Sequence, residues 1–566
     1  MRRYAGLGGF IALWLTVPLQ AATIPAADTI YVGRILTMDA TAPRAAAVAG
    51  SAGRIVAVGA RRTVMRHHGS ATQLVELGER TLLPGFIDGH GHLTATAATL
   101  RYADLSSPPV GNVKDIAGLQ QVLRAFVRER QLPAGSWLIG RGYDDAQLTE
   151  RRHPTRDDLD AVSTDYPILV VHVSGHVAAA NSRMLQALAI AADTPDPAGG
   201  VIRRRAGSSE PNGVLEEKAF MGSLAKLPTP SLDDSLRDLR RALGYYASMG
   251  ITTVQDGAIA PDGQLLLDEA AKRDLLPIDV VTYRIWMPVG NPFPIDASYG
   301  VRDGRVLRAG VKLILDGSPQ AKTAYLSRPY FKPPEGKAAD YAGYPAMPQG
   351  AVDQAIAQAL ERRVGVIAHA NGDAAAQMLI DAVAKARMAQ PSATMPPITM
   401  IHAQTVRDDQ LDRMATLGIS PSFFVAHTFF WGDWHRDETL GPERGARISP
   451  LRSALDRGLE FSLHNDSPVV PPDIVQTLWS AVTRQTRSGV VLGPEQRIKA
   501  MDALRALTIN AATQQGEAAL KGSITVGKQA DFVILSRDPT SADPAALRGI
   551  SVYRTVSRGR TVYQAP

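Results

Sequence analysis

Two histidines separated by a single residue carry the clearest chemical signal in this sequence. His90 and His92 follow the largely apolar segment 82–87, and glycines occupy positions 89 and 91. In a β-strand, residues i and i+2 point to the same side, so both imidazoles can reach one metal ion. The glycines keep the space around them free of side chains. The alternative interpretation is a strand end with two partly exposed histidines.

Four more residues with metal-binding chemistry end short apolar segments further along the chain. They are Lys312, His369, His402 and Asp466. The chain contains no cysteine, so a metal site must use histidines and carboxylates rather than thiolates. The sequence therefore predicts a divalent-metal centre with one or two ions. Zinc is the default ion for such ligands, and iron, manganese or nickel are alternatives.

The apolar segments that precede these residues alternate with helical patterns. A strand that ends at His92 and seven later strands make eight, and we predict helices between several of them. Eight strands that alternate with helices fit an α/β fold of the (β/α)8 TIM-like barrel type, which places active sites at the C-terminal ends of its strands. The seven later strands are expected at 250–256, 281–286, 310–317, 364–369, 398–402, 419–424 and 459–466, and helices at 236–249, 351–363, 374–389 and 408–417.

Both ends of the chain are rich in β-branched residues and glycine, which is typical of short strands and turns. We expect these ends to form one small β-sandwich domain. The long stretch after the first barrel strand is too long for one connection, and we expect it to form a subdomain that covers the barrel mouth. The predicted domains are a signal peptide at 1–22, a composite β-sandwich at 23–83 and 519–566, and a barrel at 84–518 with the insertion at 94–248.

The N-terminus has the pattern of a secretory signal. Arg2 and Arg3 precede an apolar stretch at 7–17, and small residues follow near position 21. We expect a periplasmic or secreted protein with no stable membrane anchor after cleavage; an uncleaved anchor is the alternative. The net charge of +6 comes from scattered residues, so we expect a small-molecule substrate and no nucleic-acid partner. A homodimer is possible.

The order of these motifs resembles that of the amidohydrolase superfamily over most of the chain. The resemblance is greatest to the branch with the YtcJ-like proteins and N-substituted formamide deformylases. It implies that His90, His92 and Asp466 hold the more buried metal, and that His369 and His402 hold a second. The matching segments are 82–93, 174–176 with 181–182, 213–216, 311–318, 369–373, 401–404 and 522–535.

The resemblance also implies that Lys312, carboxylated on its amine, bridges two metals. A free ammonium has no lone pair for a cation, whereas a carbamate is an anionic oxygen ligand, and burial makes the reactive neutral amine accessible. The alternative for Lys312 is an ion pair with Asp316 or another acid. Glu216 is a second candidate for a bridging carboxylate and is also a candidate for substrate contact.

Asp466 is the expected general base, because a carboxylate beside a metal can take a proton from water at neutral pH. Its alternative role is a helix N-cap before Ser467. His464, two residues earlier, departs from the small residues that the branch often carries there. We expect it to be a pocket residue, a partner of Asp466 or a further ligand.

Several residues are candidates for substrate contact. His176 follows an apolar strand and is the candidate donor to the substrate carbonyl; a helix cap is its alternative. Tyr143 and Asp144 are candidates at the entrance, or part of a solvated turn. Phe424 and Trp431 belong to an aromatic cluster that favours an apolar or aromatic pocket, or ordinary core packing.

The sequence thus predicts a metal-dependent hydrolase that cleaves an amide-type C–N bond, N-acyl or N-formyl, in a small molecule. Alternatives are a lactonase or deaminase on the same scaffold, lyase or isomerase chemistry, and a metal-bearing protein that only binds a ligand.

Overall fold

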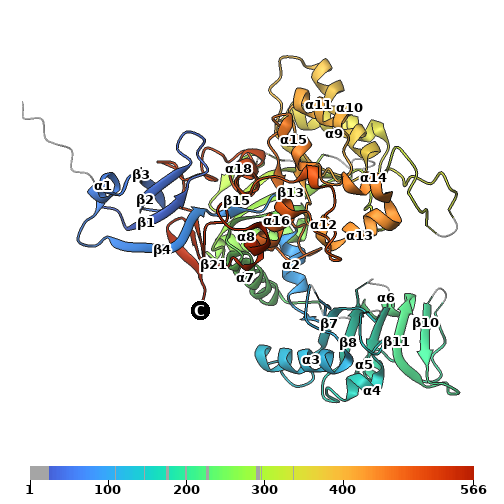
Figure 1. Cartoon of the computed structure of the whole chain (residues 1–566). Helices are drawn as coiled ribbons and strands as arrows, with labels where there is room; N and C mark the ends of the chain where they lie inside the picture. Colours follow the sequence, from blue (N-terminus) through green and yellow to red (C-terminus); the bar gives the residue numbers. More distant parts are fainter. Residues whose placement is uncertain are drawn as a thin grey trace, which may run out of the picture.

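The computed structural model describes residues 25–108, 110–145, 147–173, 177–197, 200–224, 229–287, 293–294, 296, 298–334 and 337–566. Figure 1 shows a central barrel, a sheet built from both chain ends to one side of it, and a separate lobe below it. The predicted signal segment 1–22 and His176 lie outside the described residues. Of the helices in the described part, none has the length and apolar character needed to cross a membrane.

The barrel sheet contains eight parallel strands in chain order. Its first and last strands are only two residues long, and the segments that follow them meet. The amide of Asp466 donates to the carbonyl of His90 at 3.2 Å, and the amide of His92 donates to the carbonyl of Ser467 at 2.8 Å. The predicted TIM-like barrel is therefore confirmed. Its strands are β5 (Phe86–Ile87), β12 (Ile251–Ile259), β13 (Asp279–Ile285), β15 (Val306–Ile314), β16 (Gly365–Ala370), β17 (Ile398–His402), β18 (Ile419–Phe423) and β19 (Ser462–Leu463), and β14 (Arg302–Asp303) pairs with β15.

The helices around the barrel begin and end at recognisable signals. The α7 helix starts with a capping box, in which the Ser231 hydroxyl accepts from the Asp234 amide and the Asp234 carboxylate accepts from the Ser231 amide. The α11 helix ends at Gly418 in the left-handed conformation. The helices are α2 (Leu93–Thr99), α7 (Leu232–Ser248), α8 (Pro261–Lys272), α9 (Gln349–Arg362), α10 (Asp373–Ala389), α11 (Asp408–Leu417), α12 (His427–Phe430), α13 (Gly432–Trp434), α14 (Gly441–Ala446), α15 (Leu451–Asp456), α16 (Ile474–Thr483), α17 (Ala500–Ala506) and α18 (Ile509–Gln514), with a π-helical turn η2 (His435–Thr439) and a 3-10 turn η3 (Pro494–Gln496).

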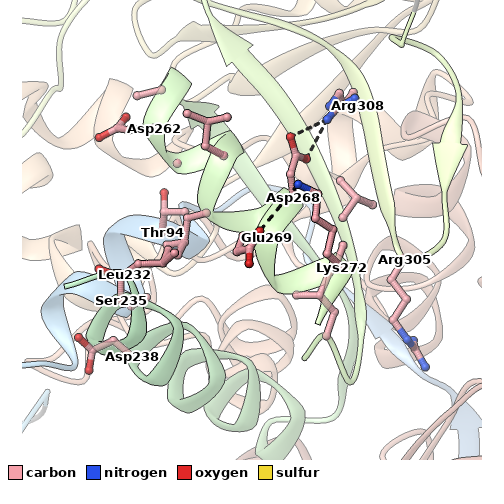
Figure 2. Close-up of a pocket in the computed structure, with 18 of the residues that line it drawn as sticks. Thr94, Leu232, Ser235, Asp238, Asp262, Asp268, Glu269, Lys272, Arg305 and Arg308 are labelled. Atoms are coloured by element: carbon pink, nitrogen blue, oxygen red, sulfur yellow. Dashed lines mark hydrogen bonds and ion pairs between the residues drawn. The ribbon is translucent and has the colours of Figure 1, made fainter. Parts of the chain in front are cut away.

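A wide hollow of about 1550 Å³ lies on the outside of the barrel, along α2, α7 and α8. Its walls carry ion pairs such as Asp268 with Arg308 at 2.8 Å (Figure 2). None of the histidines discussed above lines it, so this hollow is separate from the candidate metal centre.

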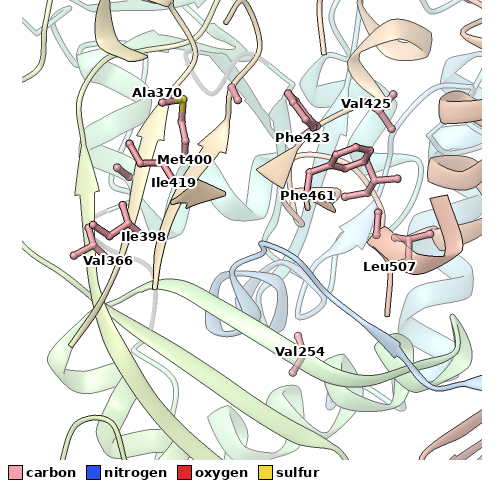
Figure 3. Packing of buried hydrophobic residues seen from close by; sticks show 14 of the residues in the cluster. Val254, Val366, Ala370, Ile398, Met400, Ile419, Phe423, Val425, Phe461 and Leu507 are labelled. Carbon is pink, nitrogen blue, oxygen red and sulfur yellow. The ribbon is translucent and has the colours of Figure 1, made fainter. Parts of the chain in front are cut away.

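Alternate residues along each barrel strand face either the outer core, towards the helices, or the barrel interior. Val366, Met400 and Ile419 pack in the outer core with the helices (Figure 3), whereas Ile367 and Ile401 belong to an interior cluster. Lys312 and His369 have the interior parity of their strands. His402 has the outward parity of Met400, but its φ of 73° takes the backbone out of the strand conformation. Asp466, with φ of 55°, is also left-handed.

The lobe is inserted between α2 and α7 and has its own core. The insertion predicted at 94–248 is shorter in the structure, because α2 and α7 at its two ends pack in the barrel core. The lobe has one six-stranded sheet in the order β10-β11-β9-β8-β7-β6. Its strands are β6 (Ala103–Asp104), β7 (Leu138–Tyr143), β8 (Ile168–His172), β9 (Val177–Ala180), β10 (Gly200–Arg204) and β11 (Pro211–Glu217), and its helices are α3 (Ile116–Arg130), α4 (Arg156–Asp160), α5 (Ser182–Ala187) and α6 (Lys218–Leu224).

Both chain ends contribute to one seven-stranded sheet in the order β22-β21-β20-β4-β1-β2-β3. The predicted β-sandwich is not confirmed, because hydrogen bonds join all seven strands into a single sheet. The N- and C-terminal parts meet where β4 pairs antiparallel with β20. The strands are β1 (Thr29–Leu36), β2 (Arg44–Ser51), β3 (Arg54–Gly59), β4 (Gln73–Pro84), β20 (Phe532–Leu535), β21 (Val552–Ser557) and β22 (Arg560–Gln564), with α1 (Arg61–Val64), η1 (Met65–His67) and η4 (Pro544–Gly549) in the connections.

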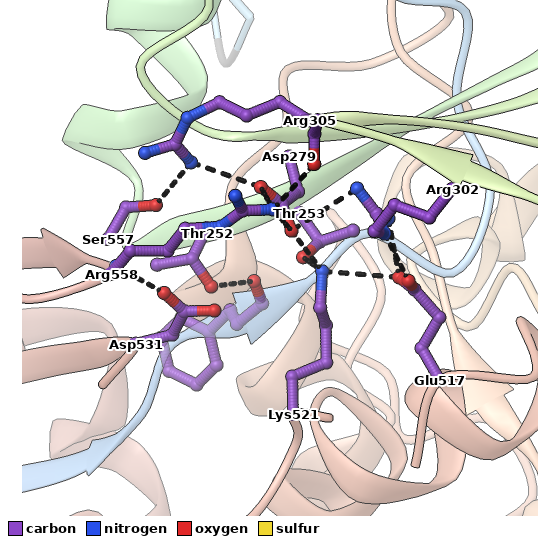
Figure 4. A network of polar contacts seen from close by, with 12 residues as sticks. Thr252, Thr253, Asp279, Arg302, Arg305, Glu517, Lys521, Asp531, Ser557 and Arg558 are labelled. Carbon is purple, nitrogen blue, oxygen red and sulfur yellow. Dashed lines mark hydrogen bonds and ion pairs between the residues drawn. The ribbon is translucent and has the colours of Figure 1, made fainter. Parts of the chain in front are cut away.

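A buried ionic network fastens the C-terminal part to the barrel (Figure 4). Asp279, at the start of β13, accepts from Lys521 at 2.6 Å and pairs with Arg305 at 3.0 Å. Glu517 pairs with Lys521 at 3.1 Å and with Arg302. Both Asp279 and Lys521 are almost fully buried. Since paired buried charges become costly when one partner is removed, this network couples the chain end to the barrel.

Candidate metal centre

His90, His92 and Asp466 converge at the C-terminal end of the barrel. Asp466 Oδ1 lies 3.0 Å from His92 Nε2 and 3.6 Å from His90 Nε2. The three ligand atoms all lie within 4.8 Å of one another, and Oδ1 accepts no hydrogen bond of good geometry from a described residue. Two imidazole nitrogens and a carboxylate oxygen aimed at one point form a donor set that suits a divalent cation.

Gln255 on β12 fixes the orientation of His90. Its Oε1 lies 2.7 Å from His90 Nδ1, and its Nε2 donates to the carbonyl of Gly89 at 3.1 Å. An amide oxygen only accepts, so Nδ1 of His90 must carry the proton. The lone pair is then on Nε2, the nitrogen that faces Asp466. This is the way a neighbouring group prepares a histidine for metal binding.

His369 and His402 form the second half of the centre. Nε2 of His402 lies 3.0 Å from Nδ1 of His369 and 3.9 Å from Asp466 Oδ2. The other nitrogen of His369 donates to the carbonyl of Gly317 at 3.0 Å. The other nitrogen of His402 lies 3.2 Å from Nε2 of His464. Each ring therefore turns one nitrogen towards the shared centre and has the other held by a neighbour.

Lys312 lies beside His90 in the same buried centre. Its Nζ lies 2.9 Å from His90 Nε2, and the residue is 2% exposed. Burial lowers the pKa of its amine to about 8, so a fraction of the lysine is neutral near pH 7. The alternative pairing with Asp316 is wrong, because Asp316 accepts from the backbone amides of Tyr325, Asn371 and Gly372 instead.

Electrostatics keep the centre in the protonation state that a cation requires. Burial, with the charge of Lys312 as a further cause, lowers the pKa of His369 to about 4. Burial also holds the pKa of His90 and His402 well below the ordinary histidine range. Burial alone would raise the pKa of Asp466, but the surrounding histidines outweigh it and hold that pKa well below its usual value. His90, His369 and His402 thus present neutral imidazoles beside the Asp466 carboxylate, a combination that fits a divalent metal.

His464 supports His402 rather than lining the substrate space. It is 1% exposed, and its Nδ1 lies 2.9 Å from the Ser422 hydroxyl. The ring centroids of His464 and His402 lie 5.2 Å apart. The expected roles for His464 are a pocket residue, a partner of Asp466 or a further ligand; the contact with a ligand candidate that the structure shows is with His402, at 3.2 Å between His464 Nε2 and His402 Nδ1. The N-cap alternative for Asp466 is wrong, because no described helix starts at Ser467.

A cleft of about 650 Å³ lies between the barrel mouth and the lobe. Ser467, Trp431 and Tyr245 line it from the barrel, and Asp144 and His172 line it from the lobe. The cleft therefore reaches the residue beside Asp466. Phe424 is buried between this wall and the metal centre, with its ring centroid 5.3 Å from that of His464 and 6.1 Å from that of Trp431.

Besides Asp144, the predicted site residues Tyr143 and Glu216 lie in the lobe, away from the histidine centre. Glu216 pairs with Arg203 on the neighbouring strand β10, so it does not bridge metals in this arrangement. Tyr143 is fully buried, and its hydroxyl lies 3.1 Å from His153 Nδ1. Nearby, Asp144, Asp145 and His172 form a second group whose ligand atoms lie within 4.8 Å of one another. Both corrections have one cause: the lobe has its own core and holds these side chains in its own sheet.

Sequence reasoning missed residues that hold the centre in place. Gln255 had no recognisable motif. Asn371 follows a candidate ligand by two residues, and its Nδ2 donates to the same Gly317 carbonyl at 2.9 Å. His427 is buried beside Phe424 and Trp431, and His435 is buried beside His427; neither histidine ends an apolar strand segment, so no local pattern marks it as a site residue.

Comparisons with known proteins agree with this geometry. The family model described as "Amidohydrolase family" matches residues 73–563. The N-substituted formamide deformylase of Arthrobacter pascens is 29% identical over 541 residues, which cover 94% of this chain and 97% of that protein. The putative amidohydrolase YtcJ of Bacillus subtilis is 28% identical over 543 residues, with coverage of 94% and 98%. The crystal structure of an uncharacterized metal-dependent hydrolase from Pyrococcus horikoshii is similar with a TM-score of 0.71 and 25% identity, and covers 91% of this chain and 99% of that one.

Proposed function

Because the chain belongs to the amidohydrolase family, we propose that its barrel hydrolyses an amide-type C–N bond, N-acyl or N-formyl, in a small molecule. The observation that carries this proposal is the convergence of His90, His92 and Asp466 within 4.8 Å of one another at the barrel mouth. The relationship to an N-substituted formamide deformylase supports the choice of bond.

We propose that His90, His92 and Asp466 hold one divalent ion and that His369 and His402 hold a second, with zinc as the expected metal. A divalent ion bound there supplies Lewis acidity, which lowers the pKa of water and polarises a carbonyl. Asp466 takes the proton of the attacking water, because its low pKa keeps it ionised and its Oδ2 faces His402. The water oxygen forms a bond to the carbonyl carbon, and return of the proton to the nitrogen lets the C–N bond break, which releases a carboxylic acid and an amine.

We propose that carbon dioxide carboxylates Lys312 on its Nζ. Carboxylation needs the neutral amine, and the pKa of about 8 makes that form accessible. The carbamate would face His90, 2.9 Å from the present Nζ, and would place an anionic oxygen between the two halves of the centre. The pairing of Glu216 with Arg203 in the lobe supports the choice of Lys312 over Glu216.

The substrate enters through the cleft between barrel and lobe. Trp431 and Tyr245 give this cleft an aromatic wall, which favours an amide with an apolar or aromatic substituent. We further propose export to the periplasm or beyond, on the strength of Arg2, Arg3 and the apolar stretch that follows.

The test is elemental analysis of the purified protein together with assays on N-formyl and N-acyl amides, lactones and amino-substituted heterocycles. We expect about two equivalents of metal, turnover of amides, and loss of turnover on chelation that returns when zinc is added. Turnover of lactones or deamination alone would replace the proposed bond specificity. A protein that binds metal but converts no substrate class would instead support a binding role.

A further inference from the structure

A chain of two buried histidines ends beside the metal centre and lies outside the ligand set. His427 and His435 are 3% and 0% exposed. Their rings are nearly parallel, at an interplanar angle of 6° and a centroid distance of 5.4 Å, and His427 Nδ1 lies 3.1 Å from His435 Nε2. The other nitrogen of His435 lies 2.9 Å from the hydroxyl of Thr439. The three residues therefore form one hydrogen-bonded chain.

Thr439, at the buried end of these hydrogen bonds, determines which atom is the donor in each of them. Thr439 is completely buried, and among the described residues His435 Nδ1 is the partner of its hydroxyl. If the hydroxyl accepted from His435, its own proton would be buried without an acceptor, which costs about 1–3 kcal/mol. The hydroxyl must therefore donate to Nδ1 of His435. His435 then carries its proton on Nε2 and donates it to Nδ1 of His427.

The same reasoning places the remaining proton of His427 on Nε2. That nitrogen has no hydrogen-bond partner within the described part of the chain, and it is not sealed from solvent like the buried unpaired atoms elsewhere in the protein. His427 packs between Phe424, at a ring distance of 4.4 Å, and Trp431, at 4.6 Å. Phe424 adjoins His464, and Trp431 lines the cleft. The His427 ring thus lies between Phe424, which adjoins His464, and Trp431, which lines the cleft.

Burial keeps both rings neutral. It lowers the pKa of His435 to about 3. Burial and the proximity of His435 hold the pKa of His427 well below its ordinary value, and the charge of Asp466 is close enough to oppose this effect. The π-helical turn η2 carries both His435 and Thr439, and such turns are frequent at functional sites.

We propose that His427 is a catalytic residue that donates a hydrogen bond from Nε2 to an oxygen of the bound substrate, with His435 and Thr439 as positioning residues that fix its tautomer. The inference rests on the proposed amide hydrolysis for the identity of the substrate. An N–H donor at His427 favours substrates that have an acceptor oxygen on their acyl group, directed towards the Trp431 side of the cleft. It also fills the role that sequence reasoning gave to His176.

His427→Phe tests the donor, because phenylalanine keeps the ring between Phe424 and Trp431 and removes the N–H. We expect kcat/KM for amides to fall at least about tenfold with metal content unchanged. His427→Gln, which can place an amide N–H near the former Nε2, should recover part of the loss. Equal kcat/KM in wild type and His427→Phe would overturn the proposal.

Two further measurements separate this inference from the proposed hydrolysis. Nitrogen-15 spectra of histidine-labelled protein report tautomers without turnover. We expect the Nε2–H form for His427 down to pH 5 in the wild type, and a mixture of tautomers in Thr439→Val; an Nδ1–H form in the wild type would overturn the proposal even if amides are hydrolysed. Calorimetric binding of benzohydroxamate, an amide analogue that chelates metals, should weaken about tenfold in His427→Phe, and unchanged binding would also overturn it.

Discussion

Asp466 combines two demands in one side chain, a ligand to a cation and a base for water. Its backbone is left-handed, with φ of 55°, and asparagine tolerates this conformation almost as well as aspartate. Asp466→Asn therefore removes the charge with little backbone strain. We expect turnover to fall by about three orders of magnitude while most of the metal is retained.

Amide turnover and metal content of Asp466→Asn, measured on the same preparation, check this expectation. Asn465→Asp is unsuitable as a control because Asn465 is buried against Thr477. Asp409→Asn is suitable, since its carboxylate lies on the surface. If Asp466→Asn turned over like Asp409→Asn, the role of Asp466 as base would be refuted.

A separate prediction concerns the metal content of a Lys312 variant. Lys312→Ala removes the amine that would carry the carbamate, so we expect metal content to fall from about two equivalents towards one. Protein equilibrated with carbon-13 bicarbonate should show a carbamate resonance in the wild type that is absent from Lys312→Ala. A variant that keeps both equivalents of metal would show that no bridge from Lys312 is needed.

The sequence was sufficient to predict candidate metal ligands that the fold brings together, but not the residues that orient them. His-x-His and the strand-end positions of His369 and His402 follow local patterns, and the barrel brings them together. Gln255 contacts His90 across 165 residues of sequence, and no local pattern indicates such a partner. The positions predicted for Tyr143 and Glu216 differ from those in the structure. Their local motifs do not indicate that both residues belong to the sheet of the lobe, which holds them away from the barrel.

Gly257 on strand β12 leaves room for the His90 ring because it has no side chain. A Cβ atom on Gly257 would lie 2.2 Å from Cε1 and 2.4 Å from Nδ1 of His90. Gly257→Ala must therefore displace a ligand candidate. We expect metal content and turnover to fall severalfold or more while the fold persists.

Gly244→Ala is the matched control for Gly257→Ala. Gly244 lies within α7, and a Cβ there meets no other atom within 4 Å. Alanine should raise the free energy of unfolding by about 0.5–1 kcal/mol and leave metal content unchanged. Normal metal content in Gly257→Ala would mean that His90 is free to move, contrary to the close packing described here.

The predicted helices show how far local signals reach. The helix predicted at 408–417 matches α11, and that at 374–389 differs from α10 by one residue at its start. Apolar periodicity and capping residues specify such helices locally. The terminal sheet was harder, because the number of stacked layers depends on how β4 and β20 pair across more than four hundred residues, and the alternation of residues is the same for one sheet or two.

The ionic network around Asp279 gives the assembled protein a defined response to acid. Burial raises the pKa of Asp279, but Lys521, Arg302 and Arg558 outweigh it and lower the pKa to about 2. In the unfolded chain the same carboxyl titrates near its ordinary value of about 3.9. Its stabilising contribution is therefore complete above about pH 4 and is lost as the pH falls towards 2. Urea unfolding between pH 6 and pH 3 should show this loss.

Lys521→Met should destabilise the protein by about 3 kcal/mol at pH 7, because it leaves buried carboxylates without their cation. It should also move the acid-induced loss to higher pH, since the pKa of Asp279 rises without Lys521. Lys385 is the control: it pairs with Asp353 on the surface with its side chain 72% exposed, and Lys385→Met should change stability by less than about 0.5 kcal/mol. Equal unfolding midpoints for the two variants would show that the network contributes nothing to stability.

The pairing of β4 with β20 also sets an order for biosynthesis. Residues 81–84 pair antiparallel with residues 532–535, so one edge of the N-terminal strands stays unpaired until the ribosome has added the more than four hundred residues between them. A nascent chain with such an unpaired strand edge is prone to aggregation. Late pairing of β4 with β20 equally delays the step that joins the two ends of the chain into one rigid sheet.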